Sequence, residues 1–191
     1  FIESSSFKSL NNIIKLIMAI KTIITEPSEI LRQKSKLVDI VGEEERKLMD
    51  DMLDTMYYAN GIGLAAIQIG IPKRIIVMDI SKNKEKKNPM YFINPIIKNK
   101  NSEYSTYEEG CLSVPNYFAE IDRPTKCEVE YLDYNGQKQI IKTEGLLSTC
   151  IQHEVDHLEG ILFIDHLSKL KKTMIVKKLS KQKDRPDRII V

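Results

Sequence analysis

The sequence predicts an α+β protein in which antiparallel β-sheets pack around one central helix, with an amphipathic helix before the sheets and another helix at the C-terminal end. Three observations predict this architecture. Apolar residues with helical spacing occupy 43–60, short β-branched and alternating segments fill much of 74–143, and a second helical pattern covers 146–158. Because the strands follow one another instead of alternating with helices, we expect them to pair antiparallel.

The composition is that of an ordinary globular domain. The chain has 191 residues, of which 42% are hydrophobic and 29% charged, enough for one core. Its net charge of +2 is too small to indicate nucleic-acid binding by itself. No apolar run reaches the roughly 18 residues that a membrane span needs. Three cysteines cannot all pair with one another, which favours a reducing compartment such as the cytoplasm.

Residues 1–17 allow two interpretations. They contain three consecutive serines, two lysines, one acidic residue and no arginine. One interpretation is an extension upstream of a domain that begins near Met18, and the other is an organellar targeting peptide. We therefore divide the chain into this extension, a main domain over 18–170 and a basic tail over 171–191.

The first elements are helical. A short helical turn is expected at Glu29–Leu31. The amphipathic helix over 43–60 ends near Gly61, and its core face is formed by Leu48, Met49, Met52, Leu53, Met56 and Tyr57.

Several short strands follow. The β-branched segment 74–78 predicts one strand, and 91–93 predicts another that ends at Asn94 and Pro95. Residues 126–134 alternate strictly between apolar and polar positions, and Asn135-Gly136 predicts a two-residue hairpin turn into 137–143. The intervening segment 82–88 is charged and predicts a solvated loop.

The helix over 146–158 carries the motif His-Glu-x-x-His at residues 153–157. Residues four apart lie on one face of a helix, so His153 and His157 can bind one metal ion. Glu154 lies beside them, where it can accept a proton from a metal-bound water. Leu146 and Cys150 continue the same stripe towards the N-terminus of the helix, which predicts that this face lines a pocket.

A catalytic metal of this kind needs a third protein ligand. The metzincin pattern would place a histidine at the position of Phe163, and the thermolysin-like pattern needs a glutamate downstream, but none follows Glu159. His166 is an alternative third ligand, although it lies beyond the end of the helix. Cys111, in a stretch of small residues after a predicted strand, offers a thiolate instead.

Three segments together resemble the peptide deformylase family. They are GIGLAAIQ at 61–68, EGCLS at 109–113 and QHEVDH at 152–157, in the order of the family's motifs. The resemblance extends over roughly 18–170. It implies removal of the formyl group from the N-terminal formyl-methionine of nascent polypeptides by metal-assisted hydrolysis, with release of formate.

The resemblance also implies residue roles. Cys111, His153 and His157 would bind the metal, and Glu154 would be the general acid and base. The Gln68 amide and the Leu112 N–H would stabilise the oxyanion. Backbone groups near Ile62, Gly63 and Gly110 would hold the peptide as an added strand. Tyr107, Leu146 and Cys150, with Ile62 and Thr149, would line the methionine pocket. We further expect Glu109 and Arg123 to pair and hold the loop that carries Cys111.

The sequence leaves several alternatives open for the identity of the metal and of the binding partners. Cysteine with two histidines suits Zn²⁺ as well as Fe²⁺; the resemblance implies Fe²⁺, replaceable by Ni²⁺, Co²⁺ or Zn²⁺. The tail after His166 is rich in lysine, which fits either a solvated helix or contact with ribosomal RNA. We expect a monomer. A zinc endopeptidase, a silent formyl-peptide-binding module and a structural metal site are the competing functions.

Overall fold

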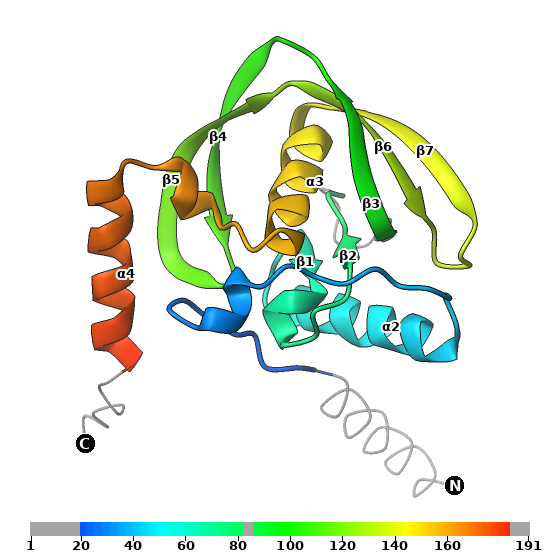
Figure 1. Cartoon of the computed structure of the whole chain (residues 1–191), viewed down its shortest axis with the longest axis horizontal. Helices are drawn as coiled ribbons and strands as arrows, with labels where there is room; N and C mark the ends of the chain where they lie inside the picture. The colour runs from blue at the N-terminus through cyan, green and yellow to red at the C-terminus, as the bar shows by residue number, and fades with distance from the viewer. Residues whose placement is uncertain (1–19, 82–85, 184–191) are drawn as a thin grey trace, which may run out of the picture.

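The computed structural model describes residues 20–81 and 86–183 (Figure 1). The two interpretations of residues 1–17 fall outside these ranges, as does the end of the basic tail. Within them, no helix has both the length and the apolar character that crossing a bilayer requires.

Helical segments occur near both ends of the described part of the chain and in its middle. They are η1 (Glu29–Arg32), α2 (Glu43–Tyr58), η2 (Ala66–Ile69), α3 (Gly145–Leu158), η3 (Phe163–His166) and α4 (Lys169–Lys183). The strands are β1 (Gly63–Ala65), β2 (Ile75–Met78), β3 (Met90–Lys100), β4 (Tyr104–Cys111), β5 (Val114–Pro124), β6 (Lys126–Leu132) and β7 (Lys138–Glu144).

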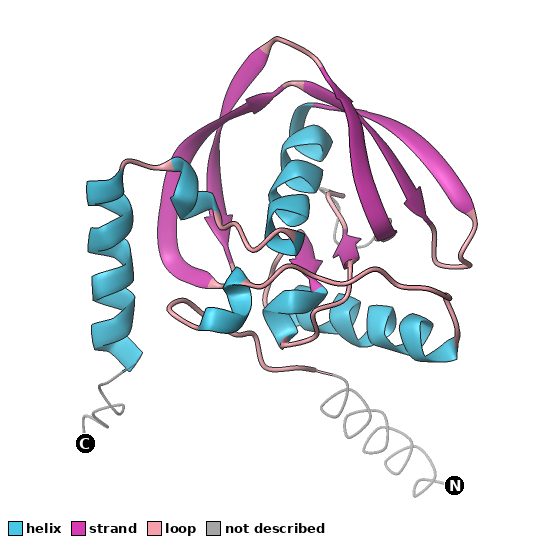
Figure 2. Cartoon of the chain, in the orientation of Figure 1, coloured by secondary structure: helices cyan, strands magenta, loops and turns pink. Residues whose placement is uncertain are grey.

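The strands form two antiparallel sheets. One has five strands in the order β1-β2-β3-β6-β7, and the other is the pair β4-β5. Figure 2 shows the two sheets arching over α3, with α2 below and α4 outside the β4-β5 pair. The predicted α+β class, with antiparallel sheets around a central helix, is confirmed.

Helix α3 is central because it buries two faces. Ile151 and Leu158 are fully buried against Ile76, Phe92 and Val129 of the large sheet. Both belong to an apolar stripe that the sequence predicts at helical spacing, formed by Leu147, Ile151, Val155 and Leu158. The opposite face carries the two histidines. Two glycines with positive φ, at 145 and 160, mark the start of the helix and the turn after its end.

Helix α2 packs beneath β1 and β2. Its buried methionines, Met49, Met52 and Met56, contact Leu64 and Val77, so the predicted core face is correct. The unbranched methionine side chain suits this junction because it adapts to irregular gaps between a helix and a sheet.

The prediction that the strand beginning at 91 ends at Asn94 and Pro95 is wrong. Strand β3 continues to Lys100, with a register shift between Ile93 and Ile96. Asn94 takes φ of 51° there and exchanges two hydrogen bonds with the Val38 backbone, of 2.9 and 2.8 Å. Proline has no backbone N–H, and a bulge tolerates it because the ladder needs no donor at that position.

The hairpin after β6 also differs from the prediction. The β6-β7 ladder ends at the pair Leu132 and Lys138, so the connection spans 133–137 instead of two residues. Asp133 accounts for the difference, because its carboxylate accepts hydrogen bonds from the backbone N–H groups of Asn135 and Gln137.

Candidate active site

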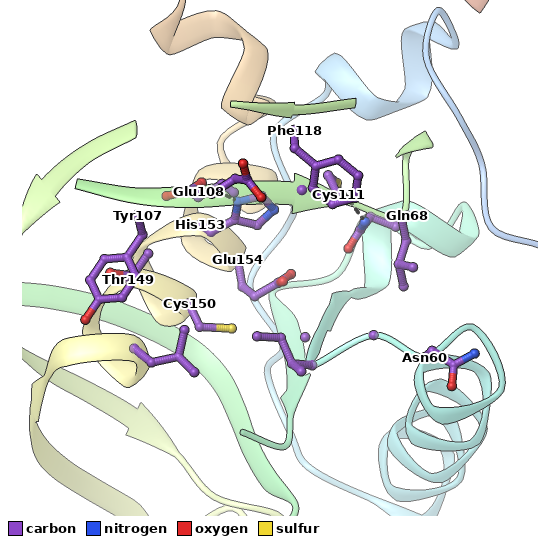
Figure 3. Close-up of a pocket in the computed structure, with 17 residues that line it drawn as sticks. Asn60, Gln68, Tyr107, Glu108, Cys111, Phe118, Thr149, Cys150, His153 and Glu154 are labelled. Carbon is purple, nitrogen blue, oxygen red and sulfur yellow. Dashed lines mark hydrogen bonds and ion pairs between the residues drawn. The ribbon is translucent and has the colours of Figure 1, made fainter. Parts of the chain in front are cut away.

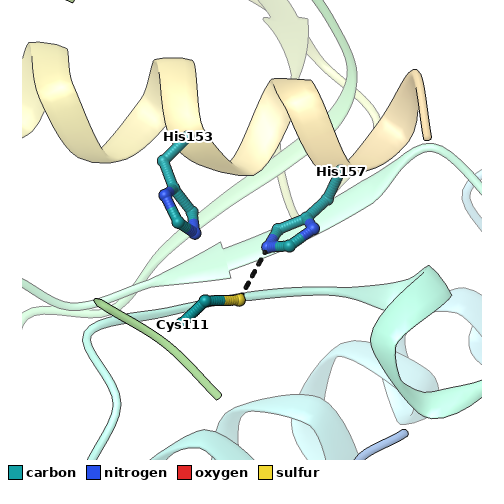
Figure 4. A group of neighbouring side chains, drawn as sticks. All are labelled: Cys111, His153 and His157. Carbon is teal, nitrogen blue, oxygen red and sulfur yellow. Dashed lines mark hydrogen bonds between the residues drawn. The ribbon is translucent and has the colours of Figure 1, made fainter. Parts of the chain in front are cut away.

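The end of β4 and one face of α3 bring three candidate metal ligands together. The Cys111 Sγ lies 3.3 Å from His157 Nε2. A ligand atom from each of Cys111, His153 and His157 lies within 4.8 Å of the others, and the described residues contain no second group of this kind. Figure 4 shows both imidazole rings directed at the sulfur. His166, the open alternative for the third ligand, instead contacts Asp156 at 2.9 Å.

The orientation and the protonation of the two histidines bear on whether they can bind a cation. His153 Nδ1 contacts Glu109 Oε2 at 2.8 Å, which leaves its Nε2 free to face Cys111. Burial, and then the neighbouring His153, lower the pKa of His157 well below its usual value. A neutral imidazole is the form that binds metals, so this shift favours metal binding by His157. Burial alone would lower the pKa of His153 too, but its hydrogen bonds with Cys111 and Glu109 outweigh burial and raise it well above its usual value. With a thiol and two histidines converging in this way, the residues present fit a divalent cation.

Glu109 and Arg123 form a buried ion pair behind the site. Arg123 donates from Nε and Nη2 to the two oxygens of Glu109, over 2.5 and 3.0 Å, and from Nη1 to Asp156 over 2.8 Å. Burial alone would raise the pKa of Glu109, but the hydrogen bonds with His153 and Arg123 outweigh it and lower the pKa. The β4-β5 pair is thus tied to α3 through a charged network.

Glu154 is the least solvated acid of the site. Its side chain is buried, and its Oε2 has no hydrogen-bond partner among the residues in the described ranges. Burial is the main reason that its pKa rises to about 7. A carboxyl group of this pKa can both accept and donate a proton near neutral pH.

The orientation of the Gln68 amide follows from its partners. The Ala65 N–H donates to one amide atom over 2.8 Å, so this atom is Oε1. The amide nitrogen therefore lies on the other side, where it donates to Ser113 Oγ over 3.1 Å and lies 3.6 Å from Cys111 Sγ. Gln68 presents N–H donors to the site, as an oxyanion contact requires.

These groups line one cavity of about 280 Å³ (Figure 3). Of the residues singled out in the sequence, it contains Ile62, Gly63, Gln68, Tyr107, Glu109, Gly110, Cys111, Leu112, Leu146, Thr149, Cys150, His153 and Glu154. Arg123 and His157 lie behind its wall.

Four lining residues were missed in the sequence: Asn60, Gly61, Glu108 and Phe118. Phe118 is aligned with Gly110 in the β4-β5 ladder, and a methyl group at Gly110 would lie 2.5 Å from its ring. No local pattern shows this, because the contact depends on the register of two strands.

Comparisons with known proteins agree with this geometry. The family model described as polypeptide deformylase matches residues 20–173. A peptide deformylase from Pelagibacter ubique is 72% identical over 174 residues, which cover 91% of this chain and all of that protein. One from Agrobacterium fabrum is 53% identical over 86% of this chain and 96% of its own length.

The chain belongs to the polypeptide deformylase family. It is therefore an enzyme of the hydrolase class that acts on amides, as the resemblance of its motifs implies. Solved structures agree: a peptide deformylase from Ehrlichia chaffeensis superposes with a TM-score of 0.82 at 42% identity, covering 89% of this chain and 99% of that one. A second structure from that organism, in complex with actinonin, gives a TM-score of 0.81 at 43% identity, over 87% of this chain and 99% of that one.

Proposed function

We propose that this deformylase hydrolyses the N-formyl group of N-terminal formyl-methionine in nascent polypeptides, producing formate and a free N-terminus. The observation that supports this best is the convergence of Cys111, His153 and His157 beside the unpaired Glu154 oxygen, in a cavity that also contains the Gln68 amide.

Cys111, His153 and His157 hold one divalent cation in this proposal, with Fe²⁺ as the native metal and Zn²⁺, Ni²⁺ or Co²⁺ as substitutes. When bound, such a cation lowers the pKa of a water molecule and polarises the formyl oxygen. The Glu109 carboxylate orients His153 through its Nδ1, and Arg123 keeps that carboxylate ionised.

Glu154 moves the proton. It accepts a proton from the attacking water and delivers it to the amine nitrogen as the C–N bond breaks. Its burial supports both steps, because a carboxyl group whose pKa is about 7 holds and releases a proton at similar cost.

Gln68 and Leu112 stabilise the negative oxygen that develops on the formyl group. The Gln68 side-chain N–H faces the Cys111 sulfur, and the Leu112 backbone N–H lies one residue further along the same loop. Loss of one donor of this kind typically lowers kcat about 10²- to 10³-fold.

The cavity beyond the catalytic groups accommodates methionine. Tyr107, Leu146 and Cys150 give it an apolar wall, which suits an unbranched thioether. Ile62, Gly63 and Gly110 also line the cavity, and their backbone groups would hold the peptide as an added strand.

Formate release from a formyl-methionyl peptide tests the proposal. The protein would be purified without oxygen, loaded with Fe²⁺ or Ni²⁺, and compared with Glu154→Ala and with Glu144→Ala, whose glutamate is exposed at the start of α3. We expect formate from the wild type and Glu144→Ala, and at least 100-fold less, as a rough value, from Glu154→Ala.

Other outcomes select other functions. Peptide binding without formate would indicate a silent binding module, and cleavage of internal peptide bonds would indicate an endopeptidase. Either would refute the proposal.

We also propose that the exposed face of α4 contacts ribosomal RNA. Over 169–181, where the structure describes its side chains, the exposed lysines of this helix are Lys169, Lys171, Lys177, Lys178 and Lys181. A K177E/K178E variant should co-sediment with ribosomes less than the wild type and with a weaker salt dependence, whereas K142E, a charge reversal on β7, should not differ. Equal co-sedimentation of the two variants would contradict this contact.

A further inference from the structure

We propose that Ser113 is a positioning residue that orients the Gln68 amide so that one N–H points at the developing oxyanion. The inference rests on the proposed function and concerns a residue that lies outside the cavity lining. Ser113 is fully buried, and Gln68 is 1% exposed, so no bulk water competes for the hydrogen bond between them.

The amide of Gln68 is held at both ends. Its Oε1 accepts from the Ala65 N–H over 2.8 Å, and its Nε2 donates to Ser113 Oγ over 3.1 Å. An amide group is planar, and its two N–H bonds have a fixed angle between them. Once one N–H is directed at Ser113, the direction of the other N–H is therefore fixed as well.

The second N–H faces the candidate metal site, where Nε2 donates to Cys111 Sγ over 3.6 Å, long for a hydrogen bond. Gln68, Cys111 and Leu112 all line the cavity. Ser113 thus directs a donor to the place beside the candidate metal ligand where the formyl oxygen would lie.

The position of Ser113 does not depend on its hydroxyl group. Its backbone N–H donates to Cys111 Sγ over 3.4 Å, and its carbonyl accepts from the Glu26 N–H over 2.9 Å. Replacing the hydroxyl by hydrogen should therefore remove the acceptor for Gln68 while the loop keeps its course.

Without that acceptor, a buried N–H has no partner, which is unfavourable, and the amide turns away from its present orientation. We expect Ser113→Ala to lower kcat about 10-fold, part of the loss that follows removal of an oxyanion donor, with KM changed less than about twofold. Ser113→Thr, which keeps a hydroxyl group, should recover most of the activity.

Ser148 offers a matched control. It is also fully buried, and its Oγ also accepts from a glutamine amide, that of Gln152, over 3.1 Å. It does not line the cavity. Ser148→Ala should therefore retain wild-type kcat, and a loss equal to that of Ser113→Ala would mean that any buried serine has this effect, which would overturn the inference.

A double-mutant cycle with Gln68→Leu distinguishes an effect of Ser113 on the position of the Gln68 amide from an effect on the structure of the site as a whole. If Ser113 acts through Gln68, Ser113→Ala should change kcat less than about twofold in the Gln68→Leu background. A full 10-fold loss in that background, or an unchanged kcat for Ser113→Ala in an otherwise wild-type enzyme, would overturn the inference.

A measurement on the metal-free protein is independent of turnover. The NMR signal of the Gln68 side-chain amide can be assigned by its loss in Gln68→Leu. In Ser113→Ala, but not in Ser148→Ala, its chemical shift should change and its amide hydrogens should exchange faster with solvent. An unchanged signal would overturn the inference even if activity fell.

Formate release by the wild type tests the proposed function separately, so an active wild type with a fully active Ser113→Ala refutes the role of Ser113 alone.

Discussion

A methyl group added at Gly63 would lie 2.4 Å from Glu154 Oε1 and 2.9 Å from its Cδ. Carbon and oxygen in contact normally stay about 3.3 Å apart, so Gly63→Ala requires the carboxylate to move by about 0.9 Å. The φ of Gly63 is not in the left-handed region, and the backbone of β1 therefore accepts alanine without strain.

The expected effect is a loss of activity without a loss of the fold. The atoms in conflict belong to the end of a side chain, which can turn without moving α3. Displacement of a reacting group by about 1 Å can lower the rate about 100-fold, and we expect Gly63→Ala to lower kcat by roughly this factor.

The assay is formate release under saturating formyl-methionyl peptide, with circular dichroism and thermal unfolding to verify the fold. Gly42→Ala is the matched control, because a methyl group there would lie 3.5 Å from Glu45 Oε2, an ordinary contact. Wild-type kcat in a folded Gly63→Ala protein would refute the reasoning, since it would show that Glu154 does not need its present position.

Three further predictions concern stability. Arg123→Met leaves Glu109 buried without its arginine partner and should lower the free energy of unfolding by about 3–5 kcal/mol in urea titrations; a loss below about 1 kcal/mol would contradict this. Gly160→Ala should cost at least about 1–2 kcal/mol, because φ is +76° and the methyl group would lie 2.4 Å from the Arg32 carbonyl oxygen, and unchanged thermal unfolding would disprove it. Burial would raise the pKa of Asp79, but the hydrogen bonds that it accepts outweigh burial and lower it. The contribution of Asp79 to the free energy of unfolding is therefore present above the unfolded-state pKa of about 3.9 and is lost as pH falls below that value. Asp79→Asn should therefore make the free energy of unfolding depend less on pH on the acid side. An unchanged slope of this free energy against pH would count against the prediction.

Local patterns were enough to predict the α-helices and the candidate ligands on α3. The stripe of Ile151 and Leu158 and the four-residue spacing of His153 and His157 both follow from the period of a helix, and the structure places them on separate faces. The alternation in 126–134 likewise predicted the buried face of β6. These features depend on residues close together in the chain, so periodicity is sufficient to find them.

The sequence by itself thus determined the fold class, the central helix and the family, through its motifs. Tertiary structure decided the features that join distant segments. Strand β3 passes through Asn94 and Pro95 because Val38, 56 residues away, satisfies the Asn94 amide. The Gln68 amide takes its direction from Ser113, 45 residues further on. The raised pKa of Glu154 results from burial, which no local pattern measures, because the groups that exclude water from a site are assembled only when the chain has folded.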